Sequence, residues 1–344
     1  MKVARLYQFD DIRIEDEPVP RVGPCDALIR AEACGICSGD VMPWYIEKKA
    51  PLVLGHEPVG QLVELGSSIK SGELQFSVGD RLFVHHHAPC LICAHCKRGD
   101  YVQCETWRRT TLVPGGISEY ILVPEINLRH DTLLLPPQIT SNDGALTEPA
   151  ACVVKSLRRA SIREGDAVLV IGLGVMGLLH VLLAREFGAG KIIGADLVPY
   201  RLSKAVQFGA DEVIDVSREG LVESLREFTR GQMASIVIVC PNSAEAMMQG
   251  IETVAPGGTV VFFTPARPGE LLHIDPNSLY FRDISIVTSY SCGPDDTRRA
   301  LDFIKRGVVT AEKLVTHRFT IDEAEKAFRM TAEARDSLKC LIVF

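Results

Sequence analysis

Four cysteines fall within a stretch of fifteen residues and offer a complete set of metal ligands. They are Cys90, Cys93, Cys96 and Cys104. Four thiolates that leave no open position are typical of a closed, tetrahedral structural zinc site. The ferredoxin cluster motif also begins with two C-x2-C steps, but it ends with a spacing of three and a Cys-Pro pair. Here seven residues precede Cys104 and Glu105 follows it, so the spacing predicts zinc.

A second possible metal site is spread over the first half of the chain. It consists of Cys37, the neighbours His56 and Glu57, and Glu148. One thiolate, one imidazole and carboxylates form the mixed set expected of a catalytic zinc that keeps a position open for substrate. Such a zinc polarises a substrate oxygen and stabilises an alkoxide. Taken alone, Cys34 and Cys37 also match the spacing of a redox pair.

Other cysteines and histidines are given structural roles. The consecutive His85, His86 and His87 are interpreted as polar lining beside the cysteine lobe and not as ligands. The scattered cysteines are expected to be small buried apolar residues. They are Cys25, Cys152, Cys240, Cys292 and Cys340.

A glycine motif marks a possible nucleotide site. It reads Gly172-Leu173-Gly174-Val175-Met176-Gly177, after an expected strand at 167–171 and at the start of an apolar helix expected over 175–187. The first glycine permits a tight turn, the second lets the backbone approach a pyrophosphate, and the third allows helix and strand to pack closely. The N–H groups at the helix N-terminus then face the phosphates.

The cofactor's identity is read from an acidic residue downstream. Asp196 ends the second expected strand, nineteen residues after Gly177. A carboxylate there accepts both ribose hydroxyls and repels a 2′-phosphate, which favours NAD over NADP. Arg201 is a possible binder of that phosphate, but we expect it to lie alongside the adenine.

These residues need elements to position them, and the pattern of elements changes near residue 150. Before it, short strands are expected at 27–31, 60–65, 81–84 and 119–123, which indicates a β-rich domain. After it, strands expected at 167–171, 191–195, 212–216, 236–240 and 259–263 alternate with helices. This alternation predicts a doubly wound parallel sheet covered on both faces, and so an α/β fold. From about 291, helices at 295–306 and 323–331 precede a strand at 339–344, and this segment could return to the first domain.

Composition narrows the classes of protein. The 344 residues suit two domains, and 47% apolar with 24% charged residues is ordinary globular composition. A net charge of -7 gives no reason to expect nucleic acid or anionic lipid as a partner. No apolar run approaches a membrane span, and the first residues do not resemble a signal peptide, so we expect a cytoplasmic protein.

Together these residues resemble the zinc-dependent medium-chain dehydrogenase/reductase family, and within it the sorbitol and threonine dehydrogenase branch. The resemblance covers essentially the whole chain. It rests on Cys34–Cys37, Gly55-His56-Glu57 with Gly60, Gly79-Asp80-Arg81, the four-cysteine lobe, Gly116–Tyr120, Thr147-Glu148-Pro149 and Gly172–Gly177.

The resemblance implies a barrel-like, GroES-like catalytic domain made of residues 1–150 and 291–344, with a Rossmann domain at 151–290. The two ligand sets predict two zinc ions per chain and Asp196 predicts NAD, whereas a homodimer or homotetramer is implied by the family alone. Cys37, His56 and Glu148 are then the catalytic zinc positions, with Glu57 a direct or alternate ligand. Trp44 matches an aromatic position that lines the substrate pocket.

The chain departs from the family where the proton relay is expected. The hydroxyl position of the relay is Gly39 and the histidine position is Met42. Three routes for the proton remain: Ser38, a zinc-bound water working with Glu57 or Glu148, or a second hydroxyl of the substrate. We favour the carboxylate-and-water route, because zinc brings the pKa of its bound water to near neutral.

The sequence therefore predicts hydride transfer between NAD and a polyol or other secondary alcohol, in either direction. One alternative is the same fold acting on a bulky cyclic or CoA-linked alcohol, or as a dismutase. The other is a catalytically silent binding protein, against which the complete ligand sets and the intact glycine motif argue.

Overall fold

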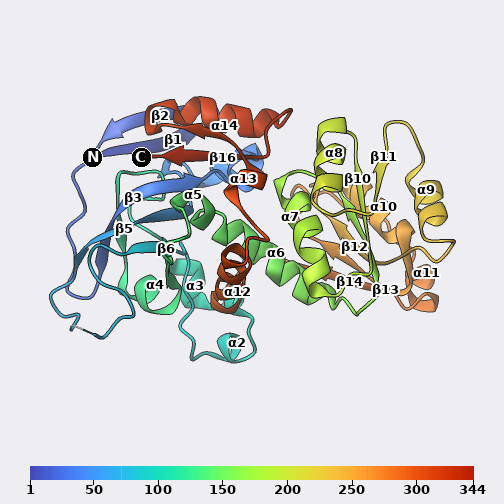
Figure 1. The fold of residues 1–344 in the computed structure, drawn as a ribbon, viewed down its shortest axis with the longest axis horizontal. Coiled ribbons are helices and arrows are strands. Elements are labelled where there is room, and N and C mark those ends of the chain that lie inside the picture. The colour runs from blue at the N-terminus through green and yellow to red at the C-terminus, as the bar shows by residue number, and fades with distance from the viewer. Residues whose placement is uncertain (71) are drawn as a thin grey trace. The chain divides into compact units, whose positions relative to one another are not determined.

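The computed structural model describes residues 1–70 and 72–344, which divide into two compact units (Figure 1). The first unit comprises Met1–Ala151 and Cys292–Phe344, and the second comprises Cys152–Ser291. Helix α6 (Thr147–Ala160) carries the chain from the first unit into the second. In the described part of the chain, no helix is long and apolar enough to cross a membrane.

The first unit is built mainly from β-strands. Seven strands form one sheet, in the order β15-β16-β3-β5-β6-β8 with β7 also paired to β3, and three more form the small sheet β2-β1-β4. Their bounds are β1 Lys2–Gln8, β2 Asp11–Asp16, β3 Ala27–Gly35, β4 Leu52–Val53, β5 Glu57–Leu65, β6 Arg81–Val84, β7 Tyr120–Val123, β8 Thr132–Leu134, β15 Val315–Phe319 and β16 Lys339–Val343.

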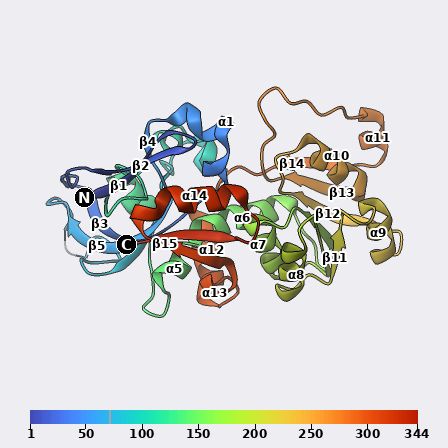
Figure 2. The ribbon, with the colours of Figure 1, turned by 90° about the horizontal axis from the view of Figure 1, so that it is seen from above.

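The last strand of the chain completes the larger sheet. The apolar run Cys340–Val343 makes β16 a buried strand, and it pairs antiparallel with β3 so that Leu341 lies opposite Gly35. Since β3 leads directly to Cys37, the C-terminal strand supports the segment that presents this cysteine. Helix α14 (Ala324–Glu333) lies beside β16 (Figure 2). Its Phe328 packs into the same apolar core.

The remaining helices of the first unit are short, apart from α12. They are α1 Pro43–Ile46, α2 Ala94–Lys97, α3 Glu105–Arg109, α4 Glu125–His130, α5 Ser141–Gly144, α12 Pro294–Lys305 and α13 Ala311–Leu314.

A buried ion pair joins β5 to β16. Lys339 Nζ lies 2.6 Å from Glu57 Oε1 and 2.5 Å from Oε2, and it also donates to the Ile36 carbonyl at 2.9 Å. Both side chains are buried. Burial lowers the pKa of Lys339, but the charges of Glu57 and Cys37 outweigh it and raise the pKa above its ordinary value. Gly35 leaves the space for this pair, because a Cβ there would lie 1.8 Å from Glu57 Oε2.

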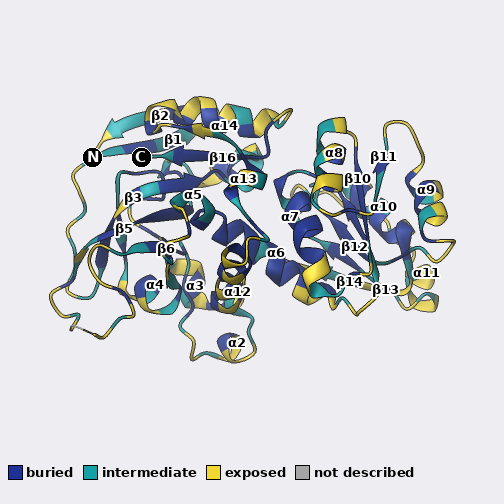
Figure 3. Ribbon diagram, in the orientation of Figure 1, coloured by how far each residue is buried: buried dark blue, intermediate teal, exposed yellow. Residues whose placement is uncertain are grey.

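The second unit is a six-stranded parallel sheet in the order β11-β10-β9-β12-β13-β14. This is the order of a doubly wound dinucleotide-binding fold, with its reversal between β9 and β12. The central strands are almost entirely buried (Figure 3). The strands are β9 Ala167–Ile171, β10 Lys191–Asp196, β11 Glu212–Asp215, β12 Ala234–Val239, β13 Val254–Phe262 and β14 Ser285–Thr288, and the helices α7 Val175–Ala184, α8 Pro199–Gln207, α9 Leu221–Phe228, α10 Ala244–Thr253 and α11 Pro276–Phe281.

The α/β class predicted from the sequence is confirmed, but the strands β2, β8, β14 and β15 were not predicted, and other elements differ at their ends. The helix predicted over 175–187 is α-helical only to Ala184, and its last turn, Arg185–Phe187, is a 3-10 turn. Gly188 ends it at φ 103°, a left-handed conformation that glycine adopts without strain.

A buried histidine lies inside the second unit. His180 Nδ1 lies 2.8 Å from the Met176 carbonyl, and Nε2 lies 2.9 Å from Ser156 Oγ. The carbonyl can only accept, so Nδ1 carries the proton and the neutral ring is fully satisfied. Burial lowers the pKa of His180 to about 4.

We predict that Lys339→Met destabilises the protein by about 3–5 kcal/mol, because it leaves the Glu57 carboxylate buried without its cation. Adding Glu57→Met should recover most of this loss, since the pair is then replaced by apolar side chains. Urea unfolding measures both effects. Lys2→Met, which breaks the exposed Lys2–Asp322 pair, is the control and should leave the midpoint almost unchanged. A double variant no more stable than Lys339→Met would contradict the prediction.

We also predict that His180 makes the protein less stable in mild acid. The pKa is lower in the folded state than in the unfolded chain, so the unfolded chain binds the proton first. The stabilisation is therefore complete above the ordinary pKa of 6.5 and is lost as pH falls toward 4. At about pH 5.5 the loss amounts to roughly 1.4 kcal/mol. Urea unfolding at about pH 7.5 and 5.5 should show a smaller pH effect for His180→Gln, and equal effects would refute the prediction.

Candidate active site and metal centres

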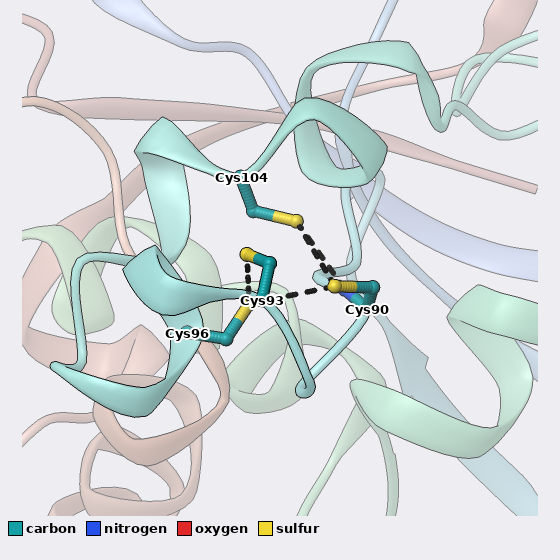
Figure 4. A group of neighbouring side chains, drawn as sticks. All are labelled: Cys90, Cys93, Cys96 and Cys104. Atoms are coloured by element: carbon teal, nitrogen blue, oxygen red, sulfur yellow. Dashed lines mark hydrogen bonds between the residues drawn. The ribbon is translucent and has the colours of Figure 1, made fainter.

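The four cysteines of the lobe converge on one point (Figure 4). The Sγ atoms of Cys93 and Cys96 are 3.5 Å apart, those of Cys90 and Cys104 are 3.6 Å apart, and those of Cys90 and Cys96 are 3.9 Å apart. A zinc ion with four sulfurs at 2.3 Å requires sulfur–sulfur separations of about 3.8 Å. The four cysteines are free thiols, so the lobe fits a tetrahedral zinc.

The local backbone prepares this lobe for a cation. Burial raises the pKa of the Cys104 thiol, but N–H groups of Cys90 and Trp107 outweigh it and lower the pKa to about 6. A thiol with such a pKa is largely a thiolate at neutral pH, which is the form that binds metal. Trp107 is buried and closes the small apolar core of the lobe.

A second group is formed by Cys37, His56 and Glu57, whose ligand atoms all lie within 4.8 Å of one another. Cys37 ends the loop after β3, and its Sγ accepts the Gly39 N–H at 3.3 Å. Glu57 begins β5, so one strand start presents both His56 and Glu57. The structure thus brings together three of the four residues predicted as catalytic zinc ligands.

Asp40 orients the histidine of this group. Its Oδ2 lies 3.1 Å from His56 Nδ1, and Asp40 is 6% exposed. A carboxylate on one ring nitrogen directs the other toward a metal. Burial lowers the pKa of His56, but Asp40 and Cys37 more than offset this and raise it well above its ordinary value. The surroundings of the ring therefore favour a positive charge.

The fourth predicted ligand, Glu148, lies in a different group. Its carboxylate is within 4.8 Å of ligand atoms of His85 and Cys292, and all three residues are buried. Glu148 is still close enough to raise the pKa of Glu57 through its charge, although burial is the larger cause of that rise.

The prediction that His85 lines the cysteine lobe was wrong, whereas the predicted burial of Cys292 is confirmed. His85 is fully buried instead of lining the cysteine lobe, because Asp131 accepts from its ring inside the unit. Cys292 is buried as predicted, but its thiol contacts His85 at 3.6 Å and is more than an apolar filler. His86 lies beside His56, with ring centroids 4.8 Å apart, and His87 lies against Trp107 of the lobe.

The segment where the relay was expected carries no acid or base at the two usual positions. A side chain at Gly39 would meet Cys37 Sγ at 3.4 Å, Met42 Cε at 3.9 Å and Tyr45 Cε1 at 4.0 Å. Ser38 is exposed. Trp44 is half-buried in α1, and in the described part of the chain its indole N–H has no hydrogen-bond partner.

Cys34 does not have the properties of a redox cysteine. It is fully buried, and burial raises the pKa of its thiol to about 12. A thiol that stays protonated is a poor nucleophile.

The glycine motif has the geometry that a pyrophosphate requires. Gly172 has φ +81°, and Gly177 packs so closely that a Cβ would lie 2.0 Å from the Gly172 carbonyl oxygen. A Cβ on Gly174, the N-cap of α7, would meet nothing within 4 Å, so the backbone at the helix start is open. Leu173, Val175 and Met176 complete the loop and first turn. These residues fit a dinucleotide phosphate.

Asp196 ends β10 next to this loop. Its Oδ2 accepts the Leu173 N–H at 2.6 Å, and its Oδ1 accepts the Val198 N–H at 2.9 Å. Arg201 Nη1 lies 3.5 Å from Asp196 Oδ2. The carboxylate is thus held at the end of the strand, as the ribose-binding position requires.

Two functional residues were missed by sequence reasoning. Asp40 lies three positions after Cys37, and that short spacing was a usable signal. Lys339 opens an otherwise apolar strand, which was also visible, but its partner Glu57 is 282 residues away. No local pattern pairs residues at that distance.

Comparison with known proteins is consistent with both units. Residues 23–132 match the alcohol dehydrogenase GroES-like domain, and residues 175–306 match the zinc-binding dehydrogenase domain. The chain is 32% identical to the D-xylulose reductase A of Aspergillus clavatus, over 98% of this chain and 95% of that protein. It is 30% identical to a sorbitol dehydrogenase of Halalkalibacterium halodurans, over 96% and 94%.

Solved structures of dehydrogenases have the same fold as this chain. A zinc-binding dehydrogenase from Sinorhizobium meliloti, bound to NADP, superposes with a TM-score of 0.88 at 29% identity, over 100% of this chain and 99% of that one. The 2R,3R-butanediol dehydrogenase of Bacillus subtilis gives 0.87 at 26%, also over 100% and 99%. With this similarity along the whole chain, and with a GroES-like unit and a parallel nucleotide-binding sheet, the chain belongs to the zinc-dependent medium-chain dehydrogenase family.

Proposed function

We propose that this protein transfers hydride between NAD and a polyol or other secondary alcohol. The observation that carries the proposal is the convergence of Cys37, His56 and Glu57 within 4.8 Å in the GroES-like unit. The relatives named for sorbitol, D-xylulose and butanediol support a polyol or diol as substrate.

Each side chain of the group has a separate task. Cys37 Sγ, the His56 ring and the Glu57 carboxylate would hold the catalytic zinc, which when bound supplies a Lewis acid for the substrate oxygen. Asp40 keeps His56 oriented, and Lys339 compensates the charge of Glu57. Ser38 is exposed and Gly39 and Met42 carry no acid, so the proton route falls to the nearby carboxylates and water.

We further propose that one zinc ion binds in the cysteine lobe and one at Cys37, His56 and Glu57. The nicotinamide cofactor would bind across Gly172–Gly177, with its adenosine ribose at Asp196 and its adenine beside Arg201. The thiolate clusters suit a reducing compartment such as the cytoplasm. A homodimer or homotetramer is expected from the family alone.

The activity prediction is that purified protein forms NADH with at least one member of a panel of polyols and secondary alcohols. Cys37→Ala and His56→Ala together should lower turnover by more than about 100-fold. Losing a residue that only orients a ligand typically costs about 10–100-fold, so losing two ligands should cost more. Asp40→Asn, which keeps the shape but removes the charge, should cost about 10–100-fold.

Ser38→Ala is the control for these variants and should cost less than about 10-fold, below the usual effect of removing a general acid or base. A wild-type protein inactive on the whole panel, in both directions, would contradict the proposed function. So would a Cys37→Ala/His56→Ala variant with nearly normal turnover.

The cofactor prediction is a preference for NAD of at least about 10-fold, or 1.4 kcal/mol, because a 2′-phosphate would meet the Asp196 carboxylate. Asp196→Asn retains the side-chain shape and should narrow the ratio of kcat/KM values for the two cofactors. Lys204→Ala, on the same helix as Arg201, is the control. Equal or better use of NADP by the wild type would show that Arg201 dominates instead.

A further inference from the structure

We propose a metal site that is separate from the cysteine lobe and from the Cys37–His56–Glu57 group. Its ligands are His85, Cys292 and Glu148, and its ion is a zinc-class divalent cation. The inference goes beyond the proposed function, because the reaction proposed above needs only the ion at Cys37, His56 and Glu57.

The distances fit such an ion. The His85 Nε2 and Cys292 Sγ atoms are 3.6 Å apart, and a Glu148 oxygen lies within 4.8 Å of both ligand atoms. A tetrahedral zinc with its usual bonds to nitrogen and sulfur places those two atoms about 3.6 Å apart. Imidazole, thiolate and carboxylate together are the soft-to-intermediate set that selects zinc over magnesium or calcium.

The histidine is already oriented as a ligand. Its Nδ1 lies 2.6 Å from Asp131 Oδ2, and the other Asp131 oxygen accepts the Thr297 hydroxyl at 2.5 Å. The Asn127 side chain also donates to the His85 carbonyl at 2.9 Å. Because Nδ1 donates to Asp131, Nε2 presents its lone pair on the side of Cys292. A carboxylate behind a histidine is the usual support of a zinc ligand.

The charges in the group also favour a cation. His85, Asp131 and Cys292 are 0–1% exposed and Glu148 is 4% exposed. Two carboxylates and a thiol thus surround one imidazole away from water, where negative charge is costly unless it is compensated. A divalent ion would compensate the buried negative charge of Glu148, Asp131 and the Cys292 thiolate.

The site would join three distant segments of the first unit. His85 follows β6, Glu148 lies in the first turn of α6, and Cys292 precedes α12. Since Glu148 is assigned to this ion, Cys37, His56 and Glu57 remain as ligands of the catalytic zinc, and the two groups share no residue.

The test is zinc content per chain of the full-length protein, measured by elemental analysis after dialysis. We expect about three ions in the wild type and about two in Cys292→Ala. Cys340→Ala is the matched control, because Cys340 is equally buried in the same unit but lies outside the ligand group, and it should keep about three. Circular dichroism establishes that each variant is folded.

Measuring zinc in the Cys37→Ala/His56→Ala variant distinguishes the proposed site from the Cys37–His56–Glu57 group. Cys37→Ala/His56→Ala should hold about two ions, and adding Cys292→Ala should leave about one. If Cys292→Ala fails to fold, His85→Gln serves in its place. Cobalt-substituted wild type should also lose part of its thiolate-to-cobalt absorption in the Cys292→Ala variant but not in Cys340→Ala.

An unchanged zinc content in Cys292→Ala and His85→Gln would overturn the inference. Cys292, His85 and Asp131 would then be a hydrogen-bonded group that binds no metal. The inference would also be overturned if Cys292→Ala removed one ion from the wild type but none from Cys37→Ala/His56→Ala. The substitutions would then affect a single shared ion. Neither result depends on turnover, so failure of this inference and failure of the proposed activity are distinguishable.

Discussion

The buried contact between Lys339 and Glu57 is the interaction on which the rest of the first unit depends. The buried Glu57 carboxylate needs a nearby cation, and Lys339 of β16 supplies it. The ammonium also fixes the Ile36 carbonyl, one residue before Cys37. Sheet pairing, the zinc-side carboxylate and the cysteine loop are thus held by one side chain, with Gly35 leaving the space that it needs.

Negative charge gathered inside the protein is a common feature of its candidate metal centres. The cysteine lobe gathers four thiols, Asp40 and Cys37 surround His56, and Asp131, Cys292 and Glu148 surround His85. In the two histidine groups a carboxylate lies on Nδ1 and leaves the other ring nitrogen facing the remaining ligands. The folded chain therefore has reason to bind metal that is independent of any reaction. The His56 side chain is 22% exposed, whereas His85 is fully buried, so the group proposed for catalysis is the more accessible of the two.

Sequence reasoning succeeded where the chemistry is local. Cys90 to Cys104 form one lobe because short spacings leave few other arrangements, and Gly172 to Gly177 form one turn for the same reason. The parallel sheet followed from alternation of apolar runs. Contacts between residues far apart in the sequence could not be predicted. His85 and Cys292 are 207 residues apart, and the sequence around each residue gives no sign of the other. The sequence also offered no way to distinguish His85, His86 and His87. They follow the strand that ends at Val84, where successive side chains point in different directions and so have different neighbours.

The division of the chain has a consequence for synthesis. Residues Cys152–Ser291 form one continuous stretch, so this unit has all of its strands when residue 291 leaves the ribosome. The other unit is begun first but lacks β15, β16 and the Lys339 ammonium until residues 315–343 are made. Until then Glu57 has no counter-ion and the edge of β3 next to β16 is open, which is the kind of surface that chaperones protect. The unit that carries the glycine motif is thus complete before the unit that carries the candidate metal centres.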